Sequence, residues 1–168
     1  GAVNLPPLSP SAAALVSLLP KGEGSQDAVE KIQLAAQSVA EGNADFALQL
    51  CGVSLESLGA NASIYVNASD AYVLKNRLLE AEVCLLHALA IGGPATSHYL
   101  NLVSLASFRG DISLARYYLD QAAGLDPSHP QLQKVRNSLE RRDQSLAKQP
   151  YRFENKWQIA KSQMKPNS

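Results

Sequence analysis

A repeat of 34 residues constrains this chain more than any other feature of its sequence. Three consecutive rows, beginning at Ala28, Ala62 and Thr96, align without a gap. Small or turn-forming residues recur in fixed columns, of which the clearest are Gly42, Asn76 and Gly110; Ala47, Ala81 and Ala115; Ser54, Ala88 and Ala122; and Gly59, Gly93 and Pro127. A fixed period of this length is typical of stacked repeat architectures.

Each row predicts two helices. The Gly/Asn column lies between two apolar-periodic stretches, where a helix ends with a left-handed residue. The alanine column lies on the second helix, where a small side chain lets two backbones approach closely, and each row stops at Gly-Ala-Asn, Gly-Gly-Pro or Asp-Pro. The predicted helices span 27–41 and 45–58, 62–75 and 78–91, and 96–109 and 112–124.

These columns resemble the tetratricopeptide repeat, whose pattern contains Trp, Leu-Gly, Tyr, Gly, Ala, Phe, Ala and Pro at fixed positions. The third row matches best, through Tyr99, Leu102, Ala106, Gly110, Ala115, Leu119, Ala122 and Pro127, and the second row keeps Tyr65, Tyr72, Asn76, Ala81, Leu85 and Ala88. The first row is degenerate, because Lys31, Ser38 and Cys51 replace the aromatic, the tyrosine and the large apolar residue. The resemblance covers residues 28–129 and implies an all-α, right-handed superhelix of antiparallel helix pairs, an α-solenoid.

The flanks complete the predicted organisation, which divides the chain into an N-terminal segment with a short apolar helix and a linker (1–27), three repeats (28–61, 62–95 and 96–129), a capping helix (130–149) and a basic aromatic tail (150–168). Pro130 suits the first turn of the capping helix. The leucines of residues 5–19 are too apolar to remain exposed. We expect that segment to pack on the repeats, to fill a groove, or to join two copies as a homodimer. Without an initiator methionine, the chain is expected to be an excised piece of a longer protein.

Composition excludes several classes of protein. Apolar residues make up 46% of the chain and its 15 basic and 15 acidic side chains balance, so the chain as a whole is not expected to be disordered. The same balance argues against an overall basic binder of polyanions. No apolar run approaches the ~18 residues that a membrane-spanning helix needs. Two cysteines are too few for a disulfide framework.

We find no sequence signal for catalysis. The chain lacks a Gly-x-Ser-x-Gly elbow, a phosphate loop and a dinucleotide fingerprint. Cys84 and His87 could share a helix face, but no third or fourth metal ligand accompanies them. The carboxylate pairs Glu80/Glu82 and Glu140/Asp143 are interpreted as solvated helix faces. We therefore expect no enzyme, no cofactor, no metal site and no small-molecule substrate.

Both cysteines are predicted to be buried free thiols, since Cys51 falls in a large apolar column and Cys84 lies one place before that column. Reduced thiols favour a cytoplasmic location, although a processed export signal would leave the compartment open.

The resemblance implies a binding groove, because the first helices of successive tetratricopeptide repeats line a concave surface that binds peptides or helices. The matching positions proposed as the groove are Val29, Ile32, Gln33, Ala36, Val66, Asn67, Asp70, Val73, Leu100, Asn101, Ser104 and Phe108. The amide column Gln33, Asn67 and Asn101 could pair with a peptide backbone, or could be plain helix-surface polarity. This groove is mildly apolar and nearly uncharged, which suits an apolar or amphipathic segment.

One subgroup of the family clamps a C-terminal carboxylate with lysines and an arginine. The corresponding columns here hold Ile32, Ala36, Ser97 and Asn101, and only Asn67 agrees with the subgroup. A carboxylate without a cation would lose its charge-assisted hydrogen bonds. Binding of heat-shock chaperone tails is therefore not expected.

Charge is uneven along the chain. Residues 1–129 carry 6 basic and 12 acidic side chains, whereas residues 130–168 carry 9 basic and 3 acidic ones. The basic end, interleaved with aromatic residues, could be a docking arm for an acidic protein, a phospholipid or a nucleic acid. The preferred interpretation is that it folds back on its own acidic body or solvates the capping helix, and nucleic acid is not an expected partner.

The sequence as a whole predicts a non-catalytic protein–protein interaction module, an adaptor, scaffold or assembly factor of a larger complex, whose partner is a protein or peptide. Two alternatives remain open. The layout also resembles class II type III secretion chaperones, which have a short N-terminal helix, three repeats and a terminal helix. The chain could instead be a substrate-binding accessory domain of a larger enzyme.

Overall fold

The computed structural model describes residues 25–149, and all regular secondary structure in that range is helical. The helices are α2 (Ser25–Ala40), α3 (Ala44–Leu58), α4 (Ala62–Leu74), α5 (Leu78–Gly92), α6 (Thr96–Arg109), α7 (Ile112–Leu125) and α8 (Leu132–Ala147). For the six repeat helices, every end lies within two residues of its predicted position. The three pairs α2–α3, α4–α5 and α6–α7 correspond to the three rows.

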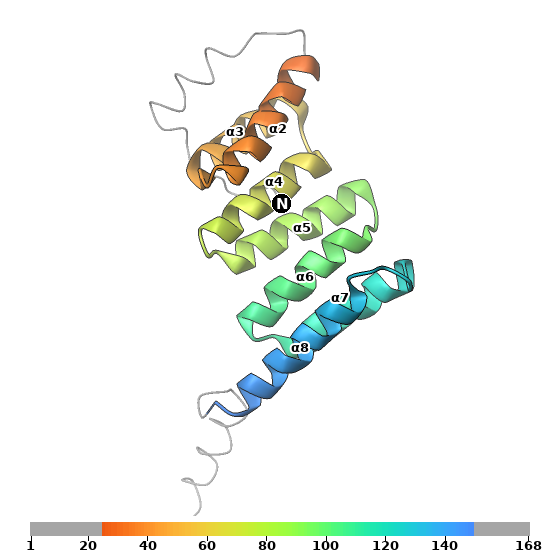
Figure 1. The fold of residues 1–168 in the computed structure, drawn as a ribbon. Coiled ribbons are helices and arrows are strands. Elements are labelled where there is room, and N and C mark those ends of the chain that lie inside the picture. The colour runs from red at the N-terminus through yellow and green to blue at the C-terminus, as the bar shows by residue number, and fades with distance from the viewer. Residues whose placement is uncertain (1–24, 150–168) are drawn as a thin grey trace, which may run out of the picture.

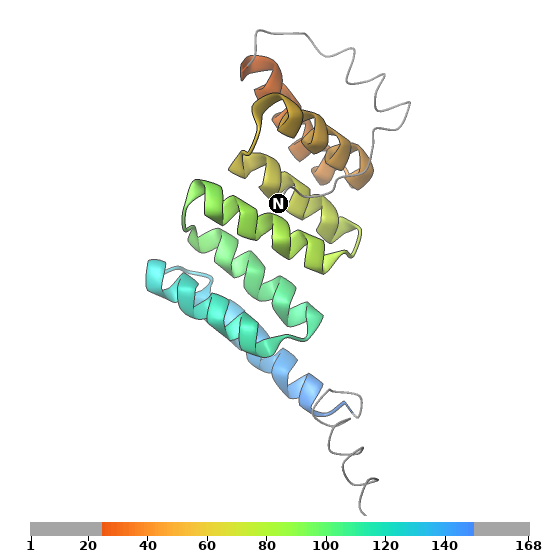
Figure 2. The same ribbon diagram turned by 180° about the vertical axis from the view of Figure 1, so that it is seen from behind.

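The helices form a stack in chain order, with α2 at one end and α8 at the other (Figure 1). Each helix of a pair packs against its partner, and α3 packs against α4 and α5 against α6 to join the pairs. The view from behind shows the same succession of layers (Figure 2). The predicted α-solenoid is confirmed.

The turns within the pairs have the predicted conformation. Gly42, Asn76 and Gly110 all have positive φ, at 81°, 57° and 89° respectively. Gly110 is a left-handed cap of α6, which glycine adopts without a steric penalty. The following helices α3 and α7 have Asn43 and Asp111 as their N-caps. The side chains of these two residues accept hydrogen bonds from the backbone N–H groups of Phe46 and Leu114, respectively.

The alanine column lies at the centre of the pairs. Ala47, Ala81 and Ala115 are each 0% exposed. They belong to one continuous hydrophobic core, which also holds the large buried side chains Leu48, Leu50, Ile64, Leu85, Leu102 and Leu139. These alanines therefore serve packing.

The degenerate first row places polar side chains where the other rows have aromatic or apolar ones, and each has a local partner. Lys31 is buried and forms an ion pair of 2.8 Å with Asp27, one turn earlier. The Ser38 hydroxyl donates to the Leu34 carbonyl at 2.8 Å. The Cys51 thiol donates to the Ile64 carbonyl at 3.6 Å, across to α4. Buried polar groups with such partners avoid the free-energy cost of an unmade hydrogen bond.

One carboxylate is buried where the second repeat meets the third. Glu82 is 3% exposed, and its Oε1 accepts a hydrogen bond of 2.8 Å from the Tyr118 hydroxyl. Its Oε2 accepts a hydrogen bond of 2.7 Å from the Arg109 guanidinium, so α5, α6 and α7 are joined by one polar group. Burial and the adjacent Glu82 carboxylate raise the pKa of the Tyr118 hydroxyl. The interpretation of Glu82 as part of a solvated helix face is wrong, whereas Glu80 reaches solvent.

The capping helix begins later than predicted. Helix α8 starts at Leu132, so Pro130 lies in the preceding turn rather than in the first helical turn. In that turn the Gln131 backbone N–H donates to His129 Nδ1 at 3.1 Å. This hydrogen bond stabilises the turn that precedes α8.

Several predictions concern residues outside the described range. They are the short apolar N-terminal helix and the homodimer that it could form, most of the linker that follows it, and the basic tail from residue 150. Between residues 25 and 149, no helix has the length and apolarity to cross a membrane.

The buried thiols make the first testable prediction. Cys51 and Cys84 are 1% and 0% exposed, and burial raises the pKa of each thiol to about 12. The thiolate is the reactive form, so at pH 8 both native thiols are protonated as well as inaccessible. We expect them to react with a disulfide reagent at least about tenfold more slowly than in the guanidinium-unfolded chain. The exposed Ser113→Cys variant is the control, and native Cys51 or Cys84 reacting as fast as its new thiol would contradict the buried arrangement.

Candidate interaction site

The predicted groove residues lie on the first helices of the pairs and differ in how accessible they are. Val29, Gln33, Ala36, Asp70, Val73, Asn101, Ser104 and Phe108 are exposed, and Ile32, Val66 and Asn67 are half-buried. Leu100 is only 5% exposed and belongs to the hydrophobic core. Helix α6 packs against both α7 and α8, and the side chain of Leu100 is therefore not accessible to a partner.

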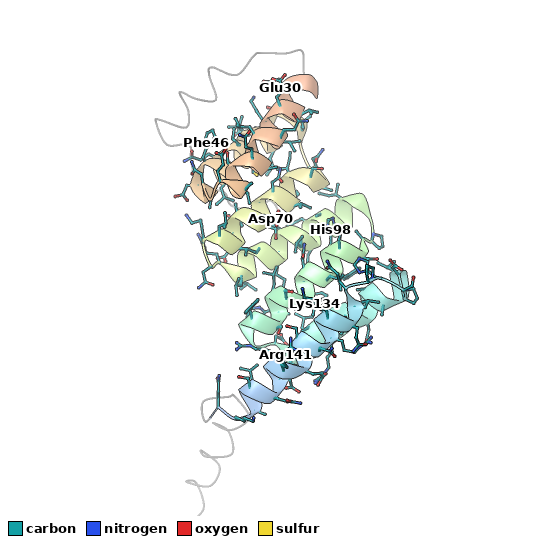
Figure 3. The ribbon with its side chains drawn as sticks, viewed as in Figure 1. Glu30, Phe46, Asp70, His98, Lys134 and Arg141 are labelled. Atoms are coloured by element: carbon teal, nitrogen blue, oxygen red, sulfur yellow. The ribbon has the colours of Figure 1, made fainter. Side chains whose placement is uncertain are left out.

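The spacing of the first helices is not uniform along the stack. Helix α2 packs against α4, and α6 packs against α8. Between α4 and α6, both described over their full length, no pair of Cα atoms lies within 8 Å. Asp70 of α4 and His98 of α6 are labelled in Figure 3 and interact electrostatically. Partial desolvation raises the pKa of the Asp70 carboxyl, and the charge of His98 opposes that rise.

A pocket of about 460 Å³ lies between α6 and α8. Helix α6 contributes Val103, Ser104, Ser107 and Phe108. The members from α8 and the turn before it are Gln131, Lys134, Val135, Ser138, Leu139, Arg141 and Arg142. Ser104 and Phe108 are thus the predicted groove residues that the structure brings together in one cavity. Phe108 is 68% exposed, the largest value among the exposed large apolar side chains of the described chain.

Helix α8 continues the repeat register, a feature that the sequence prediction missed. The first-helix positions of the third row that correspond to the groove are Ser97, Leu100, Asn101, Ser104, Ser107 and Phe108. Moving them forward by 34 residues gives Gln131, Lys134, Val135, Ser138, Arg141 and Arg142, and all six line the pocket. The helix predicted only as a cap therefore also continues the row of first helices. The groove was predicted to be nearly uncharged from three rows, and α8 adds three cations beside it, Lys134, Arg141 and Arg142.

One of these cations has a structural task. Arg142 donates from Nε to the Ser107 carbonyl at 3.3 Å and from a terminal nitrogen to the Phe108 carbonyl at 3.2 Å. These carbonyls belong to the last turn of α6, where the Ser107 carbonyl also accepts a hydrogen bond of 3.0 Å from the Gly110 backbone N–H. Arg142 thereby fixes the end of α6, and with it the backbone of Phe108, against α8.

Comparison with solved structures identifies this architecture. The second TPR domain of human RPAP3, in complex with the HSP70 peptide SGPTIEEVD, matches with a TM-score of 0.61 and 19% identity, over 67% of this chain and 94% of that one. The first TPR of Spaghetti (RPAP3), bound to the HSP90 peptide SRMEEVD, matches with a TM-score of 0.63 and 20% identity, over 75% and 99%. This chain has the tetratricopeptide-repeat fold. No family model and no curated protein sequence matches the chain.

Within this tetratricopeptide-repeat fold, one side chain of the amide column, that of Asn67, already has a hydrogen-bond partner inside the protein. Asn67, the one residue that agrees with the carboxylate-clamping subgroup, donates from Nδ2 to the Ile32 carbonyl at 3.0 Å. Its amide ties α4 to α2. Gln33 and Asn101 in the same column are exposed.

The candidate metal ligands have other contacts. The His87 ring stacks on Tyr65 with centroids 4.9 Å apart, and Cys84 is fully buried. Across residues 25–149, no three His, Cys, Asp or Glu side chains are grouped so that they could hold a metal ion.

Proposed function

We propose that this protein is a non-catalytic protein-interaction module, an adaptor or assembly factor. It binds an apolar or amphipathic segment of another protein on the face formed by α2, α4, α6 and α8. The observation that carries this proposal is the pocket between α6 and α8. Its lining combines the exposed side chain of Phe108 with the apolar side chains of Val103, Val135 and Leu139.

An exposed aromatic residue beside an apolar cavity has the character of a binding anchor. A few aromatic residues in desolvated pockets contribute most of the free energy at many protein interfaces. Arg142 holds the Phe108 backbone in place, so little order has to be imposed on that part of the surface when a partner binds.

The solved structures with a similar fold support peptide binding as the general activity, since both were determined with peptides bound. They offer no support specific to the secretion-chaperone or accessory-domain alternatives.

Replacement of Phe108 tests the proposal. We expect Phe108→Ala to weaken the affinity for a partner by at least about fivefold, equivalent to ~1 kcal/mol, because the anchor contact is lost. The helical circular dichroism signal should stay unchanged, since the side chain is outside the core. The measurement is quantitative mass spectrometry of proteins captured from source-cell extract, followed by titration of the recovered partner.

Tyr117→Ala is the matched control, because Tyr117 is an aromatic residue of 54% exposure on α7 and does not line the pocket. A partner that binds the Phe108→Ala variant as tightly as the wild type would refute the proposed site. Loss of the same partner from Tyr117→Ala but not from Phe108→Ala would place the interface on the opposite side of the repeats.

A further inference from the structure

The pocket between α6 and α8 has an unbalanced charge. Its lining, among residues 25–149, includes the cations Lys134, Arg141 and Arg142 and no carboxylate. Arg142 is engaged at the end of α6. Lys134 and Arg141 are exposed, and neither makes an ion pair or hydrogen bond to the rest of the described chain.

The carboxylates of α8 cannot neutralise these two cations, because they are used on another side of the helix. Arg116 of α7 donates to Asp143 at 2.8 Å and to Glu140 at 3.5 Å. Helix α8 thus pairs its acidic side chains with α7 and leaves positive charge beside the pocket.

The spacing of the two unpaired cations limits what can satisfy both. Lys134 and Arg141 are seven residues apart, or two helical turns, which is about 10 Å along α8 (Figure 3). Two side-chain carboxylates at the same spacing can pair with both cations at once. Val135 and Leu139 of α8, with Phe108 opposite, provide apolar surface between them.

We propose that the segment bound at this pocket is an acidic amphipathic helix with two side-chain carboxylates seven positions apart on one face and apolar side chains between them. This inference rests on the proposed function and specifies its partner. A helix lying along α8 has the same rise per residue, so its carboxylates meet Lys134 and Arg141 in register. Its apolar residues three and four positions after the first carboxylate then face the pocket, as in other helix-in-groove complexes.

Designed peptides test this chemistry directly. The probe is a fluorescent, acetylated and amidated peptide of about 18 residues, built on alanine and glutamine for helicity, with two Glu seven positions apart and Leu three and four positions after the first. Because its C-terminus is amidated, only side-chain carboxylates can contribute. One reference peptide has Lys in place of both Glu, and another has the second Glu moved to the opposite face. Fluorescence anisotropy with the full chain should rank the probe as the tightest binder of the three.

Charge reversal on α8 supplies the matched variants. We expect Lys134→Glu and Arg141→Glu each to weaken probe binding by roughly five- to tenfold, because one ion pair is lost and a repulsion is added. Arg136→Glu changes the net charge of the same helix equally but lies outside the pocket lining, so its effect should be less than about twofold. Raising salt from about 0.05 to about 0.5 M should weaken probe binding to the wild type more than to either pocket variant.

The outcomes separate this inference from the proposed function. Equal binding of the three peptides, or equal effects of Lys134→Glu, Arg141→Glu and Arg136→Glu, would overturn the acidic-helix inference. If a recovered partner is lost from Phe108→Ala yet binds Lys134→Glu and Arg141→Glu normally, the interaction site stands and its acidic specificity is wrong. If the probe binds as predicted but no protein partner depends on Phe108, the proposed function fails instead.

Discussion

Replacing Ala81 with leucine is expected to lower the thermal unfolding midpoint by several degrees. Ala81 is 0% exposed in α5, in the column of closest approach between the paired helices. Extra methyl and methylene groups in a well-packed core force side chains and backbone apart, at a cost of about 1–3 kcal/mol. In a domain of this size each kcal/mol shifts the midpoint by roughly 2–4 °C.

Ala90→Leu is the matched control, since Ala90 lies on the same helix but is exposed. Alanine and leucine differ little in helix propensity, so the control should unfold close to the wild-type midpoint. Ala115→Leu, in the corresponding column of α7, should lose as much stability as Ala81→Leu. Unfolding of Ala81→Leu and Ala90→Leu within about a degree of each other would mean that the alanine column does not mark the helix contacts.

The sequence predicted the helices well because each of its local signals occurs three times. Residues such as Gly110 and Asn76 mark the same turn in successive rows, and their positive φ angles explain why that column excludes most other residues. Ala47 and its equivalents mark the same contact, where only a small side chain fits. Backbone geometry and packing density limit which residue types such positions can hold, so the residue type itself reveals the position.

The fourth first helix was missed because groove positions lack that constraint. Arg142 occupies the column of the exposed Phe108, so neither size nor polarity repeats there. An exposed side chain is not selected by the core, and its type varies from row to row. Only the 34-residue register contained this information: extended beyond the third row, it gives the six α8 positions that line the pocket.

The burial of Leu100 depended on its neighbours and could not be predicted from its column. Val66, in the same column, is half-buried on α4, which α6 does not contact. Leu100 lies on α6, which α8 contacts directly, and is 5% exposed. Equivalent positions therefore differ in accessibility because the spacing of the first helices is not uniform.

Glu82 was misinterpreted for a related reason, since its partners are remote in sequence. The Tyr118 hydroxyl that it accepts from is 36 residues away, and Arg109 is 27 residues away. Local periodicity can distinguish a polar from an apolar face, but it contains no information on a hydrogen bond between two repeats.

Removal of the Glu82 side chain is accordingly the second change with a large expected effect. Glu82→Ala should destabilise the fold by about 2–3 kcal/mol, because the buried Tyr118 hydroxyl loses its acceptor and Arg109 loses its buried counter-charge and keeps only Asp111, at 3.7 Å. The loss falls below the range for a fully buried pair because the Arg109 side chain, at 30% exposure, can turn to water. Chemical denaturation followed by circular dichroism measures the change.

Glu80→Ala provides the comparison, because Glu80 lies on the same helix and pairs with Arg77 at the surface, where such pairs contribute at most about 1 kcal/mol. Tyr118→Phe removes one of the two hydrogen bonds to Glu82 and leaves the ion pair with Arg109, so its loss should fall between those of the two alanine variants. Equal stability of Glu82→Ala and Glu80→Ala would show that burial of the carboxylate adds nothing to the junction. The predicted order instead makes Glu82 a stabilising polar contact within the packed junction between the second repeat and the third.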